Sequence, residues 1–369
     1  MNPPAIAARA PDHVRAISRY IAGKPIEELA RELGRDPATI VKLASNENPR
    51  GPAPTVREAI ARAVVELPRY PDSNGFALKA ALARRLAVDE AQVVLGNGSN
   101  DILELVTLAF LQPGDEAVYA QHAFIVYPLA TQARGARGIA VPAREFGHDL
   151  EAMRAAVSPQ TRIVFIANPN NPTGTWIAPA ALEAFIASLP RDVVVVLDEA
   201  YNEYLVPTDR ARSVEWISRY PQLEVSRTFS KAYGLAALRV GYGIMNASVA
   251  DLLNRVRQPF NVNTLAQAAA LAALADADYV EESRLLNDAG MAQLEAGLQV
   301  LGVRYVRSRG NFVLAEVGDA GAVNSSLLAQ GVIVRPVANY GLPSWLRVTV
   351  GLPEENTRFV TALTKALRG

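Results

Sequence analysis

The stretch Val193-Val194-Val195-Val196-Leu197 decides the fold class, because five consecutive apolar residues leave a strand without a polar face. A second run of this kind, Ile163-Val164-Phe165-Ile166-Ala167, precedes it in the chain. Strands that are buried on both faces of a parallel sheet have this pattern, whereas half-exposed strands alternate apolar and polar residues. The segment 179–189 between the two runs has helical spacing, which fits a right-handed βαβ crossover. The two runs therefore predict an α/β fold with a mostly parallel sheet.

Helical and strand-like segments alternate along the rest of the chain. Helical spacing over 76–86 and 101–111 surrounds a short apolar run at 93–95, and a strand-like stretch follows at 116–119. We therefore expect residues 46–255 to form a large three-layer α/β domain. An Ala/Leu-rich helical stretch begins at Thr264, and short strands are expected beyond it, at residues 311–316, 332–334 and 346–350.

These segments predict two domains, in line with a length of 369 residues. Residues 256–369 are expected to supply a connecting helix and a smaller α+β domain. The N-terminal arm, residues 1–45, contains a helical stretch over Ile26–Leu33 and is predicted to be part of that small domain.

Composition excludes several classes of protein. The chain has 37 Lys and Arg residues against 37 Asp and Glu residues, so it lacks the basic excess with which nucleic-acid binders neutralise phosphates. It has no cysteine, which excludes disulfides, thiolate zinc sites and cysteine nucleophiles. The three histidines are scattered, and no metal site is expected. Because no apolar run has the length of a signal peptide core or a membrane span, we expect a cytoplasmic protein.

Polar residues with chemical potential follow several of the expected strands. The first group is Leu95-Gly96-Asn97-Gly98-Ser99-Asn100-Asp101, where a strand passes through a glycine turn into a helix. Free backbone N–H groups at a helix start bind anions, although for this turn taken alone an ordinary helix cap by Asn97 or Ser99 is the better interpretation. Asp101 stands where a dinucleotide-binding GxGxxG motif needs its third glycine. A phosphate site is therefore compatible with this turn, and a dinucleotide site is not.

Two further groups follow the apolar runs. Asn168-Pro169-Asn170-Asn171-Pro172-Thr173-Gly174 comes after the first run and is either a simple turn or a loop that aims amides over the sheet edge. Asp198 comes directly after the second run. If this carboxylate is half-buried, it has a cationic partner or a raised pKa; the alternative is an acidic loop residue that faces solvent.

The fourth group surrounds Lys231, which lies between the hydroxyl residues Thr228 and Ser230 and an apolar stretch that ends at Arg239. A desolvated lysine amine is nucleophilic, and a nearby arginine binds anions. The four groups together match the needs of pyridoxal phosphate. Its aldehyde requires a lysine, its ring nitrogen an acid, its ring oxygen hydrogen-bond donors, and its phosphate an arginine and a helix N-terminus.

The combination of Asn171-Pro172-Thr173-Gly174, Asp198-Glu199-Ala200-Tyr201 and the stretch from Ser230-Lys231 to Arg239 resembles the fold-type-I aminotransferases. The order and spacing of motifs along nearly the whole chain are most similar to the histidinol-phosphate aminotransferase branch. The motifs that support this branch are Leu43-Ala44-Ser45-Asn46-Glu47-Asn48-Pro49, Arg69-Tyr70-Pro71-Asp72 and Trp345-Leu346-Arg347-Val348-Thr349-Val350-Gly351.

The resemblance implies a homodimeric enzyme that binds pyridoxal phosphate and exchanges the amino group of L-histidinol phosphate with 2-oxoglutarate by a ping-pong route, in histidine biosynthesis. It implies that Lys231 forms a Schiff base with the cofactor and later moves the α-proton. Asp198 would keep the pyridine nitrogen protonated, and Asn171 and Tyr201 would hydrogen-bond the ring oxygen.

The resemblance also assigns the rest of the site. Phe124 would stack on the cofactor ring, although Gln121-His122-Ala123 departs from the usual residues before it. Arg347 would bind the anionic end of the substrate, with Asn171, Tyr20 and Arg335 as neighbours; a surface ion pair is the alternative for Arg335. The cofactor phosphate and its surroundings would be bound by Gly98, Ser99, Asn100 (where the family often has Asp), Thr228, Ser230, Arg239 and Tyr70 from the second subunit.

Three other functions remain open from the sequence. An aromatic amino-acid aminotransferase needs the same arginine and an apolar pocket. A decarboxylase of threonine phosphate uses a related scaffold. A cofactor-binding sensor without turnover is normally fused to a DNA-binding domain, for which the 45 residues before the first loop are too short.

Overall fold

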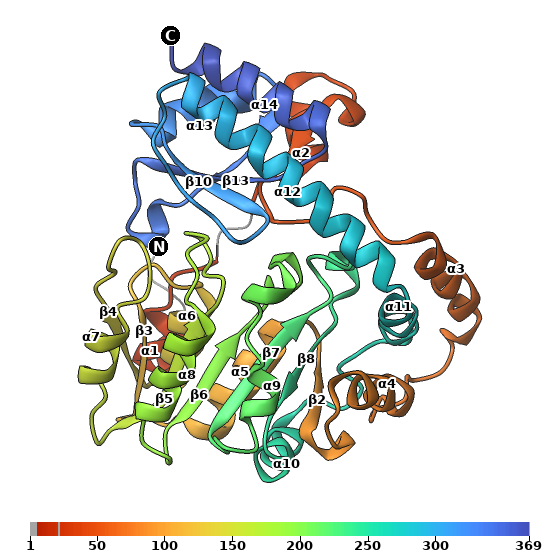
Figure 1. The fold of residues 1–369 in the computed structure, drawn as a ribbon, viewed down its shortest axis with the longest axis vertical. Helices are drawn as coiled ribbons and strands as arrows, with labels where there is room; N and C mark the ends of the chain where they lie inside the picture. The colour runs from red at the N-terminus through yellow and green to blue at the C-terminus, as the bar shows by residue number, and fades with distance from the viewer. Residues whose placement is uncertain (1–5, 21–22, 369) are drawn as a thin grey trace.

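The computed structural model describes residues 6–20 and 23–368, so positions 1–5 and 21–22 of the predicted arm lie outside the described residues (Figure 1). Among the described residues, one seven-stranded sheet has the order β2-β8-β7-β6-β5-β3-β4. Strand β8 is antiparallel to both of its neighbours, and all other pairs are parallel. This confirms the mostly parallel α/β sheet. Its strands are β2 (Val93–Gly96), β3 (Glu116–Ala120), β4 (Arg137–Val141), β5 (Thr161–Ala167), β6 (Val194–Asp198), β7 (Leu223–Thr228) and β8 (Gly241–Ile244).

The two apolar runs form the adjacent central strands β5 and β6, which pair from Ile163 opposite Val194 to Ala167 opposite Asp198. All residues of β6 are buried, because helices cover both faces of the sheet. Figure 1 shows the crossover helix α8 in front of the sheet and α5 behind it. The helices around the sheet are α5 (Ser99–Phe110), α6 (Val126–Ala133), α7 (Leu150–Ala155), α8 (Pro179–Ser188), α9 (Ser213–Trp216) and α10 (Ala247–Val256).

The direction of the strands places several loops at one edge of the sheet. Strands β3, β5, β6 and β7 are parallel, so their carboxyl ends meet at that edge. Strand β2 points the same way, since β8 is antiparallel to both β2 and β7. The glycine turn after β2 therefore lies at the same edge as the loops that contain Asn171, Tyr201 and Lys231, as expected for ligand sites in open α/β sheets.

A second, smaller group of elements lies above this edge in Figure 1. Its antiparallel sheet has the order β12-β13-β10-β9, and the N-terminal strand β1 pairs with β11. The strands expected around 311–316, 332–334 and 346–350 are thereby confirmed as β10, β11 and β13. The elements are α2 (Ile26–Leu33), β1 (Val41–Lys42), β9 (Tyr305–Val306), β10 (Phe312–Glu316), α13 (Ala320–Ala329), β11 (Val332–Ile333), β12 (Arg335–Pro336), β13 (Trp345–Thr349) and α14 (Pro353–Ala366).

Helix α12 (Ala277–Val300) runs between the two groups of elements (Figure 1). The apolar core of the large sheet includes buried residues from Val262 to Val280, beyond the expected boundary at residue 255, and the core of the smaller group includes Val41 and Leu43 of the arm. The domain boundaries themselves stay a prediction. The remaining helices are α1 (Asp12–Arg15), α3 (Pro54–Ala63), α4 (Phe76–Leu86) and α11 (Thr264–Ala275). Within the described ranges, no helix has both the length and the apolar character that crossing a bilayer requires.

Candidate active site

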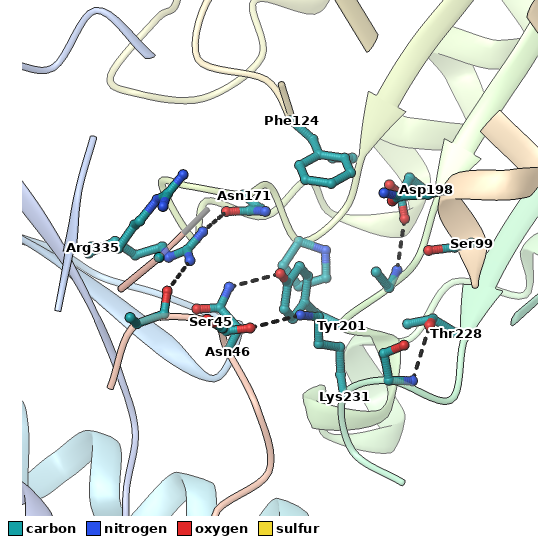
Figure 2. Close-up of a pocket in the computed structure, with 18 of the residues that line it drawn as sticks. Ser45, Asn46, Ser99, Phe124, Asn171, Asp198, Tyr201, Thr228, Lys231 and Arg335 are labelled. Atoms are coloured by element: carbon teal, nitrogen blue, oxygen red, sulfur yellow. Dashed lines mark hydrogen bonds between the residues drawn. The ribbon is translucent and has the colours of Figure 1, made fainter. Parts of the chain in front are cut away.

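A cavity of about 930 Å³, partly open to solvent, lies between the carboxyl edge of the large sheet and strand β13 (Figure 2). Segments that are far apart in sequence contribute to its wall. The sequence-predicted residues that line it are Tyr20, Ser99, Asn100, Phe124, Asn171, Asp198, Tyr201, Thr228, Ser230, Lys231, Arg239, Arg335 and Arg347.

Lys231 lies in the turn after β7, and its Nζ donates a hydrogen bond to the carbonyl oxygen of Ser45 at 3.1 Å. Its Nζ is 5.8 Å from the centroid of the Tyr201 ring. Burial lowers the pKa of Lys231 to about 8, and the positive charge of Arg347 acts in the same direction. Lys231 is therefore no solvated surface lysine, and its amine becomes a neutral nucleophile at mildly alkaline pH.

Asp198 is the last residue of β6 and is buried. Its Oδ2 accepts a hydrogen bond from the Tyr127 hydroxyl at 2.9 Å, and its Oδ1 accepts one from the Ala200 N–H at 3.1 Å. Burial raises the pKa of Asp198 to about 6, although both hydrogen bonds favour the charged form. This excludes the solvent-facing loop residue that the sequence left open.

Arg347 is buried on β13 beside two acceptors. Its Nη1 donates to Oδ1 of Asn171 at 2.6 Å and its Nη2 to the carbonyl oxygen of Ala44 at 2.7 Å, while its Nε has no partner. Both of these acceptors are uncharged, and among the described residues no ion pair of Arg347 with a carboxylate is found. Arg335 lies directly opposite Arg347 in the β12–β13 pairing. Because like charges opposite one another are unfavourable and a buried charge needs a counterion, this corner of the cavity favours an anionic ligand.

Tyr201 follows Asp198 by three residues and is buried. Its hydroxyl oxygen accepts a hydrogen bond from Nδ2 of Asn46 at 2.8 Å, which leaves the hydroxyl hydrogen free to be donated to another group. Burial raises the pKa of Tyr201 to about 12, so the phenol is neutral at physiological pH.

The glycine turn after β2 approaches Arg239 closely. A Cβ atom on Gly98, whose φ is +85°, would lie 2.7 Å from Nη2 of Arg239, so only glycine permits this contact. Nη1 of Arg239 donates to Ser230 Oγ at 3.3 Å, and the Ser230 N–H donates to Thr228 Oγ1 at 3.1 Å. The turn, the N-terminus of α5 and the guanidinium form an anion-binding corner. Gly98 itself does not line the cavity; its backbone forms the turn that lies against Arg239.

Asp101, which breaks the dinucleotide motif, fastens this turn. Its Oδ2 accepts hydrogen bonds from the Asn97 N–H at 2.8 Å and from Asn261 Nδ2 at 2.7 Å. The residue that excludes a dinucleotide pattern in the sequence therefore stabilises the turn in the structure.

Three predicted residues lie at the outer part of the cavity. Figure 2 shows the Phe124 ring near the space between Asn171 and Asp198. Tyr20 is 59% exposed, and the centroid of its ring lies 5.7 Å from Cζ of Arg335. Arg335 thus has a cation–π contact in the cavity wall.

Tyr70 does not line the cavity of its own chain. Its side chain is 82% exposed, and its ring stacks on Phe260 with 4.7 Å between the centroids. Its assignment to the site of a second subunit stays a prediction.

Sequence reasoning gave no role to Ser45, Asn46 and Tyr127, which contact Lys231, Tyr201 and Asp198. Ser45 and Asn46 belong to a quoted motif, so a signal was present without an assignment. Tyr127 lies on α6 like any core aromatic and had no local signal. In the described part of the chain, no cluster of three or more His, Asp or Glu side chains could hold a metal ion.

Comparisons with known proteins find relatives of this chain over nearly its whole length. The family model for aminotransferase class I and II matches residues 38–363. Histidinol-phosphate aminotransferase 2 of Pseudomonas aeruginosa is 62% identical over 355 residues, 96% of both chains. Histidinol-phosphate aminotransferase 1 of Cupriavidus pinatubonensis is 62% identical over 362 residues, 97% of this chain and 96% of the relative. The structure of a histidinol-phosphate aminotransferase from Sinorhizobium meliloti, in complex with pyridoxal-5'-phosphate, superposes with a TM-score of 0.90 at 30% identity, covering 98% of both chains.

Proposed function

The chain belongs to the class I and II aminotransferases, and from that premise we propose that it binds pyridoxal phosphate and transfers the amino group of L-histidinol phosphate to 2-oxoglutarate. One observation carries the proposal: Arg347 lies in the same cavity as Lys231 and Asp198. Arg347 is buried there and has no carboxylate partner among the described residues. The relatives quoted above, named for this activity, support the choice of donor. We place the reaction in histidine biosynthesis and in the cytoplasm.

The side chains of the cavity fit this cofactor. The anion-binding corner at Gly98, Ser230 and Arg239 suits a phosphate. The backbone of Gly98 lies so close to the Arg239 guanidinium that a Cβ atom at this position would collide with it. A lysine with a lowered pKa and a buried carboxylate lie in the same cavity. We therefore assign the phosphate to that corner, the aldehyde to Lys231 and the ring nitrogen to Asp198.

When bound, pyridoxal phosphate supplies an aldehyde that captures amines and a ring that stabilises the negative charge left at the α-carbon. The protein's own part is acid–base and electrostatic. Lys231, neutral above a pKa of about 8, removes and returns the α-proton. Asp198 would hold a negative charge beside the ring nitrogen of the bound cofactor. Tyr201 is neutral and has a hydroxyl hydrogen free, which it would donate to the ring oxygen together with Asn171.

Arg347 serves both substrates. L-Histidinol phosphate carries a phosphate and no α-carboxylate, whereas glutamate carries two carboxylates, so one site must bind both by their anionic ends. The planar guanidinium pairs with either kind of oxygen pair. Arg335, opposite Arg347 on the neighbouring strand, adds the second positive charge that a phosphate favours.

A comparison of kcat/KM for histidinol phosphate, phenylalanine, tyrosine and aspartate tests the choice of donor. We expect histidinol phosphate to be preferred and Arg335→Ala to lower its kcat/KM selectively. Equal or better use of phenylalanine would favour the aromatic aminotransferase. No turnover with any donor, despite bound cofactor, would favour a sensor.

Borohydride reduction followed by peptide mapping tests the cofactor assignment separately. Reduction fixes the cofactor covalently to the lysine that holds it. We expect this cofactor label on Lys231, and we expect it to be absent from Lys231→Ala. Lys79→Ala is the matched control, since burial also lowers the pKa of Lys79. A label on Lys79 or on any other lysine would contradict the assignment.

We further propose a homodimer in which Tyr70 reaches the phosphate corner of the other subunit. The exposure of Tyr70 and Phe260 supports this, because exposed aromatic pairs are typical of contact surfaces. Tyr70→Phe is expected to weaken cofactor binding without changing the sedimentation of a dimer. A monomer in sedimentation experiments would contradict the proposal.

A further inference from the structure

The segment 44–46 contacts three side chains of the cavity with three successive residues. The Ala44 carbonyl oxygen accepts from Arg347, the Ser45 carbonyl oxygen accepts from Lys231, and Asn46 Nδ2 donates to the Tyr201 hydroxyl (Figure 2). The position of this segment therefore decides where the substrate-binding guanidinium, the amine and the phenol lie relative to one another.

This segment is not held by regular secondary structure. It follows the two-residue strand β1 and precedes α3, and Asn46 has a φ of 55°, in the left-handed region that asparagine adopts more readily than most residues other than glycine. On the side of the smaller sheet, Thr349 Oγ1 accepts from the Asn46 N–H at 2.9 Å, and Asn311 Nδ2 donates to the Asn46 carbonyl oxygen at 3.0 Å. On the side of the large sheet, the contacts of Ser45 with Lys231 and of Asn46 with Tyr201 are joined by a contact of Asn48, two residues further along the chain.

We propose that Asn48 is a positioning residue, which joins the segment 44–46 to the turn that carries Lys231 and to helix α12. Asn48 is buried, and its Nδ2 donates to the carbonyl oxygen of Ala232 at 2.8 Å and to Ser283 Oγ at 2.9 Å. Its Oδ1 accepts from the Arg50 N–H at 3.0 Å. Ala232 directly follows Lys231, and Asn48 lies three residues after Ser45. The Asn48 side chain therefore joins the two chain segments whose residues Lys231 and Ser45 are in contact.

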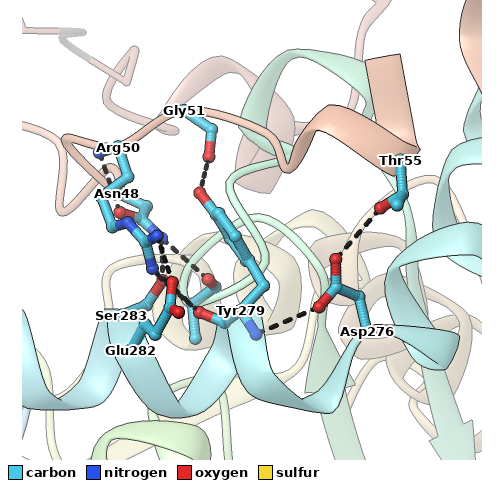
Figure 3. A network of polar contacts seen from close by, with 9 residues as sticks. Asn48, Arg50, Gly51, Thr55, Asp276, Tyr279, Glu282 and Ser283 are labelled. Atoms are coloured by element: carbon cyan, nitrogen blue, oxygen red, sulfur yellow. Dashed lines mark hydrogen bonds and ion pairs between the residues drawn. The ribbon is translucent and has the colours of Figure 1, made fainter. Parts of the chain in front are cut away.

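Helix α12 gives this junction a rigid base (Figure 3). Arg50 forms an ion pair with Glu282, and its Cζ lies 4.4 Å from the centroid of the Tyr279 ring. The Tyr279 hydroxyl donates to the carbonyl oxygen of Gly51. The Asn48 amide group donates one hydrogen bond to Ser283 on α12 and one to Ala232 in the Lys231 turn. A shift of the helix is therefore passed to the active site through this one side chain.

The chemical consequence concerns the environment of Lys231. Burial is the largest cause of the lowered pKa of Lys231. If the segment 44–46 separates from the Lys231 turn, water reaches the amine, and its titration moves toward that of a solvated lysine. A buried amide that loses both acceptors, or acceptors that lose their donor, makes such separation favourable.

Asn48→Leu tests the proposal, since it keeps nearly the size of the side chain and removes both N–H donors without adding a charge, whereas an aspartate at this position would raise the pKa of Lys231 by its negative charge alone. The measurement is the pH dependence of Lys231 modification by a small aldehyde and a mild reductant in the protein without cofactor. We expect the midpoint to rise by about half a pH unit or more, and kcat of the loaded enzyme to fall about tenfold or more.

Ser283→Ala is a milder second variant that removes one of the two acceptors, and it is expected to shift the midpoint in the same direction by less. Thr55→Ala is the control, because Thr55 contacts Asp276 of the same network at 3.1 Å but has no contact with Asn48 (Figure 3). Unchanged midpoints in both Asn48→Leu and Ser283→Ala, or an equal shift in Thr55→Ala, would overturn the proposal. The inference rests on the role proposed for Lys231, but the aldehyde titration needs no pyridoxal phosphate. Failure of the proposed function would show instead as a parent protein that the aldehyde does not modify, or as a preference for another amino donor in the kcat/KM comparison.

Discussion

Replacement of Tyr127 by Phe removes one hydroxyl group from the contact that the sequence did not reveal. The Tyr127 hydroxyl donates to Asp198 at 2.9 Å, and its ring stacks on Phe165 with 4.6 Å between centroids. Phenylalanine preserves the ring and its stacking. The variant therefore tests the hydrogen bond to the carboxylate and not the packing of the core.

The size of the effect follows from the charge of the acceptor. A hydrogen bond to a charged group contributes about 1.5–3 kcal/mol. At about 1.4 kcal/mol per pKa unit, its loss raises the pKa of Asp198 by roughly one to two units. From the value of about 6 in the parent protein, the carboxyl would reach roughly 7 to 8. At pH 7 the ionised fraction would then fall about twofold to tenfold, and at pH 9 the two proteins would be nearly equal.

The assay is a titration of the cofactor-free protein with pyridoxal phosphate, followed by absorbance between pH 5 and pH 9. Since the ring nitrogen requires the carboxylate, we expect Tyr127→Phe to weaken binding about twofold to tenfold at pH 7 and to have little effect at pH 9. Tyr119→Phe is the control, because Tyr119 is a buried tyrosine of strand β3 whose hydroxyl has no described contact with Asp198. Equal weakening at every pH, or none at pH 6 and 7, would refute the reasoning.

The remaining predictions concern titration, packing and stability. In the cofactor-free protein, the rate of Lys231 modification by an aldehyde should rise with a midpoint near pH 8, because burial lowers the pKa of the amine; a midpoint above 10 would contradict this. Gly98→Ala should abolish tight cofactor binding, measured by absorbance titration, because its Cβ would meet Arg239, whereas Gly114→Ala, at another positive φ with open space, should cost stability only. Glu224 is fully buried without a partner for either carboxylate oxygen, and burial raises its pKa well above 4.5, with Asp198 and Glu199 acting in the same direction. A carboxyl group whose pKa is raised by folding destabilises the folded protein increasingly as the pH rises above the unfolded pKa. In urea unfolding between pH 5 and 8, the free energy of unfolding of Glu224→Gln should therefore rise relative to that of the parent protein, by at most about 1.4 kcal/mol per pH unit. A difference that does not depend on pH would show that Glu224 does not titrate in this range.

Local sequence carried the parts of the fold that depend on local patterns. The apolar, β-branched runs 163–167 and 193–197 are typical of strands covered on both faces, and they form the central strands β5 and β6. Asn171 follows β5 and Asp198 ends β6, and the predicted βαβ connection gives these two strands one direction, so the convergence of the two residues at one edge followed from the sequence. The antiparallel strand β8, which lies between β2 and β7, had no equally clear signal, because short glycine-containing strands resemble loops.

What the sequence by itself determined about this protein is therefore its α/β class and the types of chemical group at the sheet edge, since both depend on residues close together in the chain. Only the tertiary structure decided which groups touch. Asn46 meets Tyr201 across 155 residues, Tyr127 meets Asp198 across 71, and Arg347 meets Ala44 across 303. Such contacts depend on the paths of long loops and on how the smaller sheet lies over the larger one. The physical reason is that the pKa values and bonding geometry of these groups arise from burial and long-range neighbours, which no local pattern of residues contains.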